Sequence, residues 1–283
     1  AVTSPSVSGR RPHVNVWRSA GRVSEAQPTA DDVVRETGWV FNNETGERLT
    51  LEQFVDTGNE EVGFYAHHLE LFWGDESASK SVLEIGSGIG RMTVAFTNNY
   101  RRVVAADVDA AFLERCRETV ARFGKVDKLQ TVYVQDGHTI DVPDQSVDLV
   151  FSYITLQHCK REDALALVAE AFRIVAPGGR VALNFRTWTA MDVVLVPVGA
   201  AVRTVWKLFP KLSRSPRLVT RFGWQANRLT PKEVVTHAMA SRGISFCVLY
   251  QSTKRRRLIL DTLVEVRRLA GLNPSHWWLV ART

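Results

Sequence analysis

The chain has 283 residues, 45% of them hydrophobic and 23% charged, which suffices for one substantial core with appendages but not for two large domains. Its net charge of +6 suits an anionic partner and an ordinary basic enzyme equally well, so charge assigns no function. The three cysteines, Cys116, Cys159 and Cys247, form no C-x-x-C pair. They therefore argue against a disulfide framework and a zinc site, and they favour a reducing, cytoplasmic compartment.

The sequence predicts no transmembrane segment. It lacks the roughly 18 uninterrupted apolar residues of a spanning helix, and its first residues lack the apolar core of a signal peptide. Peripheral contact with a membrane stays open. Residues 1–30 are rich in Ser, Pro, Gly and Arg and predict a mobile N-terminal arm, whereas residues 31–283 predict one domain.

A helix is expected ahead of the first strand. Residues 57–61 predict its start, with Asn59 as the N-cap and two acidic residues in the first turn. Apolar residues then recur at helical spacing and predict one buried face, made by Val62, Tyr65, Leu69 and Phe72.

Residues 82–93 carry the strongest pattern in the chain. Apolar residues predict a buried strand up to position 85, and three alternate glycines predict a tight turn before a helix that opens at Met92. A dinucleotide-binding turn of the G-x-G-x-x-G type would need a third glycine at position 91, where Arg91 stands, which disfavours NAD. The observed order is acidic-x-Gly-x-Gly-x-Gly, formed by Glu84, Gly86, Gly88 and Gly90.

Acidic residues also follow the next two predicted strands. Residues 103–107 form an apolar strand ending in Asp107, 23 residues beyond Glu84, where a doubly wound sheet places an acid that accepts both ribose hydroxyls. Asp109 is expected to cap the next helix instead. Residues 131–135 predict the third strand, and the Asp136-Gly137 pair after it is either a ligand contact or a turn.

The later strands complete the predicted sheet. Residues 147–153 predict the fourth strand. Segment 152–158 should line the site where the reacting ligand binds, because ligands of open α/β sheets lie at the carboxyl ends of strands. A helix over 162–175, a Pro-Gly-Gly turn and a strand over 180–185 follow.

Together these motifs resemble the class I S-adenosylmethionine (SAM) dependent methyltransferases of the small-molecule type, continuously over residues 82–186. The resemblance implies an α/β fold, a Rossmann-like doubly wound seven-stranded sheet with an antiparallel last strand. It also implies S-adenosyl-L-methionine as cofactor, with the glycine backbone against its methionyl and ribose parts and Asp136 on the adenine amine. The implied cofactor-binding residues are Glu84, Gly86, Ser87, Gly88, Gly90, Asp107, Val108, Asp136 and Gly137.

Two insertions interrupt the family pattern after the fifth strand. Residues 187–229 contain an apolar run, 193–202, in which Pro197 and Gly199 argue against one uninterrupted helix. We expect this insertion to form a cap or lid over the acceptor pocket, with binding to an anionic lipid surface as the rival interpretation. Thr230 should cap a helix that begins at Pro231, and residues 244–250 should form the sixth strand.

The end of the chain should close the sheet. Residues 252–275 form the second insertion, with a basic run at 254–257 and a helix expected over 258–270. Residues 276–281 then predict the antiparallel last strand that distinguishes this fold from the dinucleotide-binding fold.

His158, just beyond the fourth strand, is the favoured catalytic base, because removing a hydroxyl proton near neutral pH suits an imidazole. A histidine packed against the following helix is the alternative. Weaker candidates are Tyr65, His67, His68 and His276. Metal-dependent O-methyltransferases of this fold carry acids after strand four, where this chain has Ser152 and Tyr153, so no metal is expected.

The sequence therefore predicts methyl transfer from SAM to a hydroxyl of a small-molecule acceptor, such as a sugar, a glycan or a lipid-linked compound. An RNA or other N-methyltransferase is one alternative, but no Asn/Asp-Pro-Pro-Tyr motif follows strand four and nucleic acid is disfavoured. A SAM-binding protein without catalytic activity is the other. No pattern in the chain identifies the acceptor or the oligomeric state.

Overall fold

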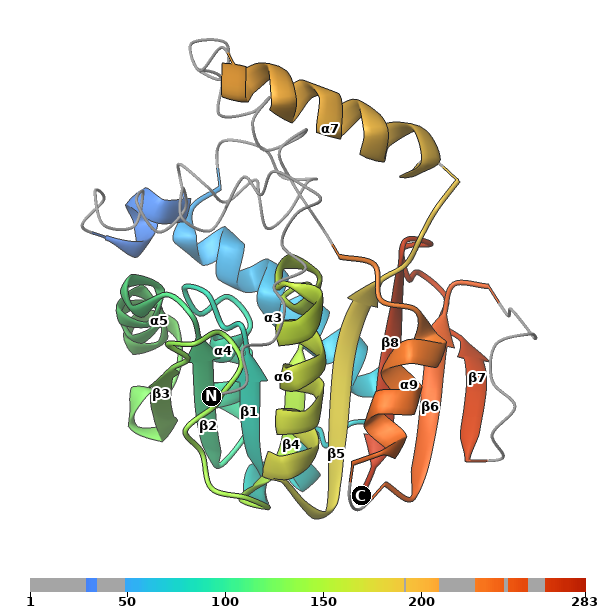
Figure 1. The fold of residues 1–283 in the computed structure, drawn as a ribbon. Helices are drawn as coiled ribbons and strands as arrows, with labels where there is room; N and C mark the ends of the chain where they lie inside the picture. Colours follow the sequence, from blue (N-terminus) through green and yellow to red (C-terminus); the bar gives the residue numbers. More distant parts are fainter. Residues whose placement is uncertain (1–28, 35–48, 191, 209–226, 242–243, 254–262) are drawn as a thin grey trace, which may run out of the picture.

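The computed structural model describes residues 29–34, 49–190, 192–208, 227–241, 244–253 and 263–283. In this part of the chain one eight-stranded sheet has the strand order β3-β2-β1-β4-β5-β8-β6-β7 (Figure 1). Its strands are β1 (Ser81–Ile85), β2 (Arg102–Asp107), β3 (Leu129–Tyr133), β4 (Val147–Ser152), β5 (Val175–Arg186), β6 (Phe246–Gln251), β7 (Val264–Arg268) and β8 (His276–Arg282).

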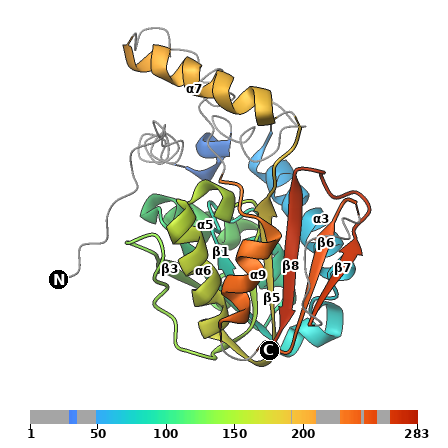
Figure 2. The same ribbon diagram turned by 45° about the vertical axis from the view of Figure 1, so that its right-hand side comes forward.

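Helices cover both faces of the sheet (Figures 1 and 2). The α-helices are α3 (Leu51–His68), α4 (Thr93–Asn99), α5 (Ala110–Phe123), α6 (Arg161–Ile174), α7 (Asp192–Leu208) and α9 (Pro231–Met239). Three short 3-10 turns are η2 (Gly74–Ser79), η3 (Val126–Lys128) and η4 (Leu156–His158). Among the described residues, no helix is both long and apolar enough to cross a bilayer.

The strand pairing confirms the doubly wound sheet with an antiparallel last strand. β1 lies between β2 and β4 and is parallel to both. β8 lies between β5 and β6 and is antiparallel to both. Because parallel strands all end at the same edge, residues that follow β1, β2, β4 and β5 gather along one side of the molecule.

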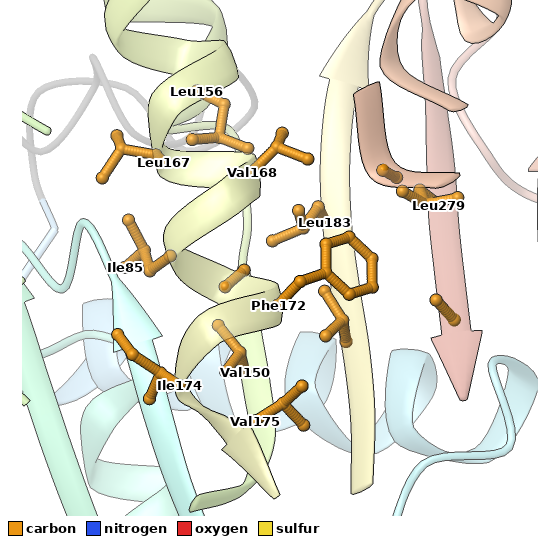
Figure 3. Packing of buried hydrophobic residues seen from close by; sticks show 14 of the residues in the cluster. Ile85, Val150, Leu156, Leu167, Val168, Phe172, Ile174, Val175, Leu183 and Leu279 are labelled. Carbon is orange, nitrogen blue, oxygen red and sulfur yellow. The ribbon is translucent and has the colours of Figure 1, made fainter. Parts of the chain in front are cut away.

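Alternate strand residues face two different helical layers, as the period of two requires. On one face, Leu83 and Ile85 pack with residues of α6 and α9, and Figure 3 shows Leu167, Val168 and Phe172 of α6 against the strands. On the other face, a second buried cluster joins β1, β2 and β4 to α3 and α4. Burial on both faces explains the nearly continuous apolar runs of the central strands.

Helix α3 begins earlier than predicted. Its N-cap is Thr50, whose hydroxyl accepts from the Gln53 amide while the Gln53 side chain accepts from the Thr50 amide. Asn59 therefore lies inside the helix. Gly58, also inside the helix, faces the turn after β1, where an added Cβ would lie 2.2 Å from the Arg91 carbonyl oxygen. Glycine at this position allows two backbones to approach closely.

The sheet has eight strands, one more than predicted, because residues 264–268 form β7 in parallel pairing with β6. The helix expected over 258–270 is therefore wrong in its described part. Val264 and Val266 are half-buried, and they alternate with the more exposed Glu265, a period of two that fits an edge strand. The basic run at 254–257 lies outside the described residues.

Helix α7 runs through Pro197 as a single element of 17 residues, so the predicted interruption is wrong. Pro197 lies in the second turn, where the missing amide removes only one early intrahelical hydrogen bond. In Figures 1 and 2, α7 stands above the carboxyl edge of the sheet. Most residues of the predicted arm, 1–28, and the rest of the insertion, 209–226, lie outside the described residues.

Candidate active site

The turn after β1 exposes bare backbone at the carboxyl edge of the sheet. Gly86 and Gly88 adopt φ values of +80° and +54°, which a residue with a side chain adopts only with strain. A Cβ at Gly86 would overlap the Thr155 side chain at 2.1 Å, whereas a Cβ at Gly88 would meet no described atom within 4 Å. The Ser87 and Gly90 amides are used inside the turn, bonded to Ala106 and Ser87 carbonyls. Only Gly88 therefore offers open space above the backbone.

Asp107 joins the end of β2 to this turn. One carboxylate oxygen accepts from the Gly88 amide at 2.8 Å, and the other accepts from the Asp109 amide at 3.0 Å. Burial raises the pKa of Asp107 to about 6, and the two backbone hydrogen bonds oppose that rise. Because each carboxylate oxygen has a second lone pair, both can still accept from a vicinal diol. Asp109 caps α5, as the sequence predicted.

Glu84 lies beneath the turn rather than on its open side. Its carboxylate accepts from the Thr93 hydroxyl at 2.6 Å, and only 4% of the residue is exposed. Burial raises the pKa of Glu84 to about 7. The structure thus connects β1 to the first residue of α4 through this carboxylate, and a direct contact of Glu84 with a cofactor stays a prediction.

Asp136 and Gly137 form the turn that follows β3. One Asp136 oxygen accepts from the His138 and Thr139 amides at 2.9 and 2.8 Å. These hydrogen bonds form a turn, which was the alternative to a ligand contact in the sequence analysis. Hydrogen bonds from Thr139 and His138 lower the pKa of this exposed carboxyl. Val108, after β2, is 49% exposed. These residues lie at the same sheet edge as Asp107, and their contact with an adenine stays a prediction.

The residues directly after β4 do not all face a ligand site. Ser152 is fully buried, and its hydroxyl donates to the Ile85 carbonyl at 3.0 Å, which fastens β4 to β1. The Tyr153 ring stacks on Trp278, and its phenol lies 3.2 Å from that of Tyr65. Burial raises the pKa of both phenols, so neither is a base near neutral pH. The expectation that Ser152 lines the acceptor site is not met.

Arg91 connects α3 to the glycine turn, a role the sequence did not indicate. Its guanidinium lies 2.6 Å from the Glu61 carboxylate and about 5.9 Å from the centre of the Tyr153 ring. It also donates to Thr57 at 3.4 Å. Together with the close approach at Gly58, these contacts place α3 over one side of the turn.

His158 ends the η4 turn and belongs to a chain of polar side chains. The Gln157 amide lies between two imidazoles, with one terminal atom 3.0 Å from His158 Nε2 and the other 3.2 Å from His276 Nε2. Asn227 fastens the same turn, because its side-chain amide donates to the Leu156 and Cys159 carbonyls at 2.9 Å. Gln157 belongs to the predicted segment 152–158, but its contact with His276 and the role of Asn227 were missed, since no local motif indicates them.

The hydrogen-bond partners determine where the protons lie in this series of polar side chains. The Asn273 oxygen accepts from the Ser275 amide, so the Ser275 hydroxyl, 2.8 Å away, must donate to it. His276 Nδ1, 3.0 Å from that hydroxyl, must then donate. Burial and, to a smaller degree, the Arg186 charge lower the pKa of His276 to about 4, so the ring is neutral and its Nε2 accepts.

The Gln157 amide must therefore turn its nitrogen to His276 and its oxygen to His158, because the two amide atoms can exchange places by a flip. In this arrangement His158 Nε2 donates to the Gln157 oxygen. The other candidates lie elsewhere: His67 and His68 are exposed at the carboxyl end of α3, and His68 contacts the Phe64 carbonyl at 2.8 Å.

Comparison with known proteins agrees with this geometry. Residues 83–183 match the family model described as a methyltransferase domain. A malonyl-[acyl-carrier protein] O-methyltransferase from Yersinia pestis is 27% identical over 189 residues, which cover 65% of this chain and 57% of the relative. A probable S-adenosylmethionine-dependent methyltransferase from Mycolicibacterium smegmatis is 33% identical over 135 residues, covering 46% of this chain and 48% of the relative. The chain thus spans about half the length of the curated relatives it matches.

Two solved structures have the same fold over nearly the whole chain. Magnesium protoporphyrin IX methyltransferase from Synechocystis PCC 6803, with bound S-adenosylhomocysteine, gives a TM-score of 0.53 at 15% identity and covers 89% of this chain and 96% of that one. The N-methyltransferase NodS from Bradyrhizobium japonicum WM9, also with S-adenosylhomocysteine, gives 0.51 at 12% identity and covers 95% and 98%.

Proposed function

Because the chain belongs to the class I SAM-dependent methyltransferases, we propose that it transfers a methyl group from SAM to a hydroxyl of a small-molecule acceptor, with His158 as the base. Its cofactor is S-adenosyl-L-methionine. A sugar, a glycan or a lipid-linked compound is the acceptor class we propose. The observation that carries the proposal is the place of His158, on the η4 turn directly after β4, where the Gln157 side-chain amide lies 3.0 Å from its Nε2 and orients the ring.

The residues at the carboxyl edge of β1 and β2 fit the cofactor. The open space above Gly88 admits a ligand against the backbone, and the Asp107 carboxylate beside it can accept two hydroxyls. Asp136 and Val108 lie at the ends of the neighbouring strands, where the adenine would lie. When bound, SAM supplies a methyl group on a positively charged sulfur, which a nucleophile displaces in line.

The protein contributes orientation and proton transfer. A hydroxyl is a weak nucleophile until its proton leaves, and His158 Nδ1 accepts that proton. The Gln157 oxygen accepts from His158 Nε2, which fixes the tautomer and stabilises the imidazolium that forms. The neutral His276 completes this support without adding a competing positive charge. Helix α3 excludes water from the side of the turn that Arg91 fastens.

The test supplies the purified chain with SAM carrying a radiolabelled methyl group and with a fractionated pool of small metabolites. We expect label in a fraction that alkali does not release, as for an ether, together with S-adenosylhomocysteine. Label released by mild alkali indicates a carboxylate ester, and label in an amine indicates N-methylation; either result would contradict the hydroxyl acceptor. S-adenosylhomocysteine binding without any transfer would indicate a protein that only binds the cofactor.

A further inference from the structure

A cavity lies along the same edge of the sheet, two strands away from β4, which His158 follows. Its volume is about 200 Å³, and it lies between the ends of β5 and β6, the start of β8 and the first residue of α9. Figures 1 and 2 show α9 against this part of the sheet. Its walls include Thr187, Pro231, Gln251, Thr253, His276 and Trp277.

Two buried donors at this cavity have no hydrogen-bond partner in the described part of the chain. They are Nε2 of Gln251 and Nε1 of Trp277, whose residues are 8% and 1% exposed. The two residues are directly paired across β6 and β8, so their side chains share one face of the sheet. Buried polar groups of native proteins are nearly always paired, which makes two adjacent orphan donors a sign of an absent acceptor.

The size and charge of the surroundings limit what this acceptor is. The cavity is smaller than the 300 to 1,000 Å³ typical of pockets for whole drug-sized ligands, so it admits one small group. Nearby, the Arg186 guanidinium lies 3.6 Å from the Asp192 carboxylate, and its buried Nε has no hydrogen-bond partner in the described part of the chain. Arg186 is also the register partner of His276. Donors and positive charge together favour an anionic oxygen group.

We propose that this cavity is a subsite that binds a carboxylate, or another anionic oxygen group, of the methyl acceptor. The proposal rests on the proposed function, since it assigns the cavity to the molecule that is methylated. β8 lies two strands from β4, about 10 Å at the usual spacing of neighbouring strands, so one small molecule spans the distance from the base to the cavity. His276 belongs to both places, because it lines the cavity and supports His158 through Gln157.

Acetate is the probe, and the indole N–H resonance of Trp277 is the readout in the full ¹⁵N-labelled chain. Trp277→Phe identifies the resonance by its loss. We expect sodium acetate to move the Trp277 proton downfield in a saturable manner, whereas sodium chloride at equal ionic strength leaves it in place. Gln251→Leu should weaken acetate binding about fivefold or more, and Gln251→Glu should abolish it by charge repulsion. Gln130→Leu, on β3, is the matched control and should bind as the wild type does.

The outcomes are distinct. A Trp277 resonance that acetate does not move, or that chloride moves equally, would overturn the subsite and indicate a cavity that holds only water. A variant that fails to fold is recognised by its thermal unfolding, and the second Gln251 variant then decides. Titration with S-adenosylhomocysteine runs in parallel: its failure beside a normal acetate response contradicts the proposed function while the anion site stands.

Discussion

Two buried carboxylates in one half of the sheet are paired within the chain, whereas two buried donors in the other half are not. In the half formed by β3, β2, β1 and β4, the chain itself provides the partners, as Gly88 and Asp109 do for Asp107 and Thr93 does for Glu84. In the half formed by β5, β8, β6 and β7, Gln251 and Trp277 keep donors without a described partner.

This contrast separates two kinds of site. The first half is formed before any ligand arrives, which lowers the ordering cost of binding a cofactor of constant structure. The second half keeps unpaired donors that a ligand would satisfy, and donors of this kind discriminate strongly against a molecule that lacks the matching oxygen. We therefore expect specificity for the acceptor to arise in the second half.

The largest effect is expected where the halves meet, at His158. His158→Ala should lower turnover roughly 100-fold or more and leave SAM affinity nearly unchanged, because the base acts on the acceptor and not on the cofactor. Steady-state kinetics and calorimetric titration of the same preparation measure the two quantities. Near-normal turnover would show that His158 only packs against α6 or that the acceptor needs no base.

Glu84 tests the internal pairing of the first half through pH. Its raised pKa of about 7 means that ionised Glu84 disfavours the folded state, so this contribution weakens stability above pH 7 and vanishes as pH falls toward the unfolded value of about 4.5. Glu84→Gln should therefore raise the free energy of unfolding by about 2 to 3 kcal/mol at pH 8 and by little at pH 4.5. Denaturant unfolding at the two pH values measures the difference, and an equal effect at both would refute the assignment.

Asp107 tests whether the first half holds the ribose. Asp107→Ala should weaken SAM binding about tenfold to hundredfold, the equivalent of roughly 1 to 3 kcal/mol for buried hydroxyls left without an acceptor. SAM affinity of the wild type should also fall as pH drops through about 6, where Asp107 takes up a proton. Calorimetry on both proteins provides the answer. Unchanged affinity would remove Asp107 from the site, and tight NADH binding by the wild type would contradict the family.

Gln157 sharpens the boundary between the halves. Gln157→Leu keeps the side-chain size but removes the acceptor for His158 Nε2, so turnover should fall about tenfold while SAM affinity holds. Because the imidazolium loses support, the rise of turnover with pH should move to lower pH, which distinguishes this role from a loss of packing. A pH–rate profile identical to that of the wild type would assign Gln157 a structural role alone.

Helix α7 carries the smallest predicted effect. Val193 and Val194 are 71% and 62% exposed, which fits either a lid over the acceptor or contact with lipid. If α7 is a lid, the Val193→Asp, Val194→Asp double variant should lose turnover a few-fold and keep SAM binding. Val126→Asp, at a valine of η3 that is 48% exposed, is the control. Salt-sensitive cosedimentation of the wild type with anionic vesicles, lost in the double variant, would favour lipid instead.

The sequence predicted the first half well because its signals are local. The acids near the ends of β1 and β2, Glu84 and Asp107, and the glycine turn between them lie within 24 residues of sequence, and each has a distinct chemistry. The start of α3 was missed for a physical reason, since Gly58 serves a close backbone contact with Arg91 and not a helix boundary.

The second half could not be predicted in the same way. Its polar groups come from Thr187, Gln251 and His276, which no spacing relates in the sequence and which the strand order β5-β8-β6 brings together. β7 was missed because an edge strand of five residues gives a weak alternating pattern beside a long basic segment.

The central claim is that one half of the sheet binds the cofactor and the other half binds the acceptor. A crystal structure of the chain with S-adenosylhomocysteine tests it most directly. The account predicts the adenosine over Gly88, both ribose hydroxyls within hydrogen-bond distance of Asp107, and the sulfur directed toward the space between His158 and the cavity at Gln251 and Trp277. A ligand that lies in that cavity itself, or whose sulfur points away from His158 with Asp107 uncontacted, would contradict it.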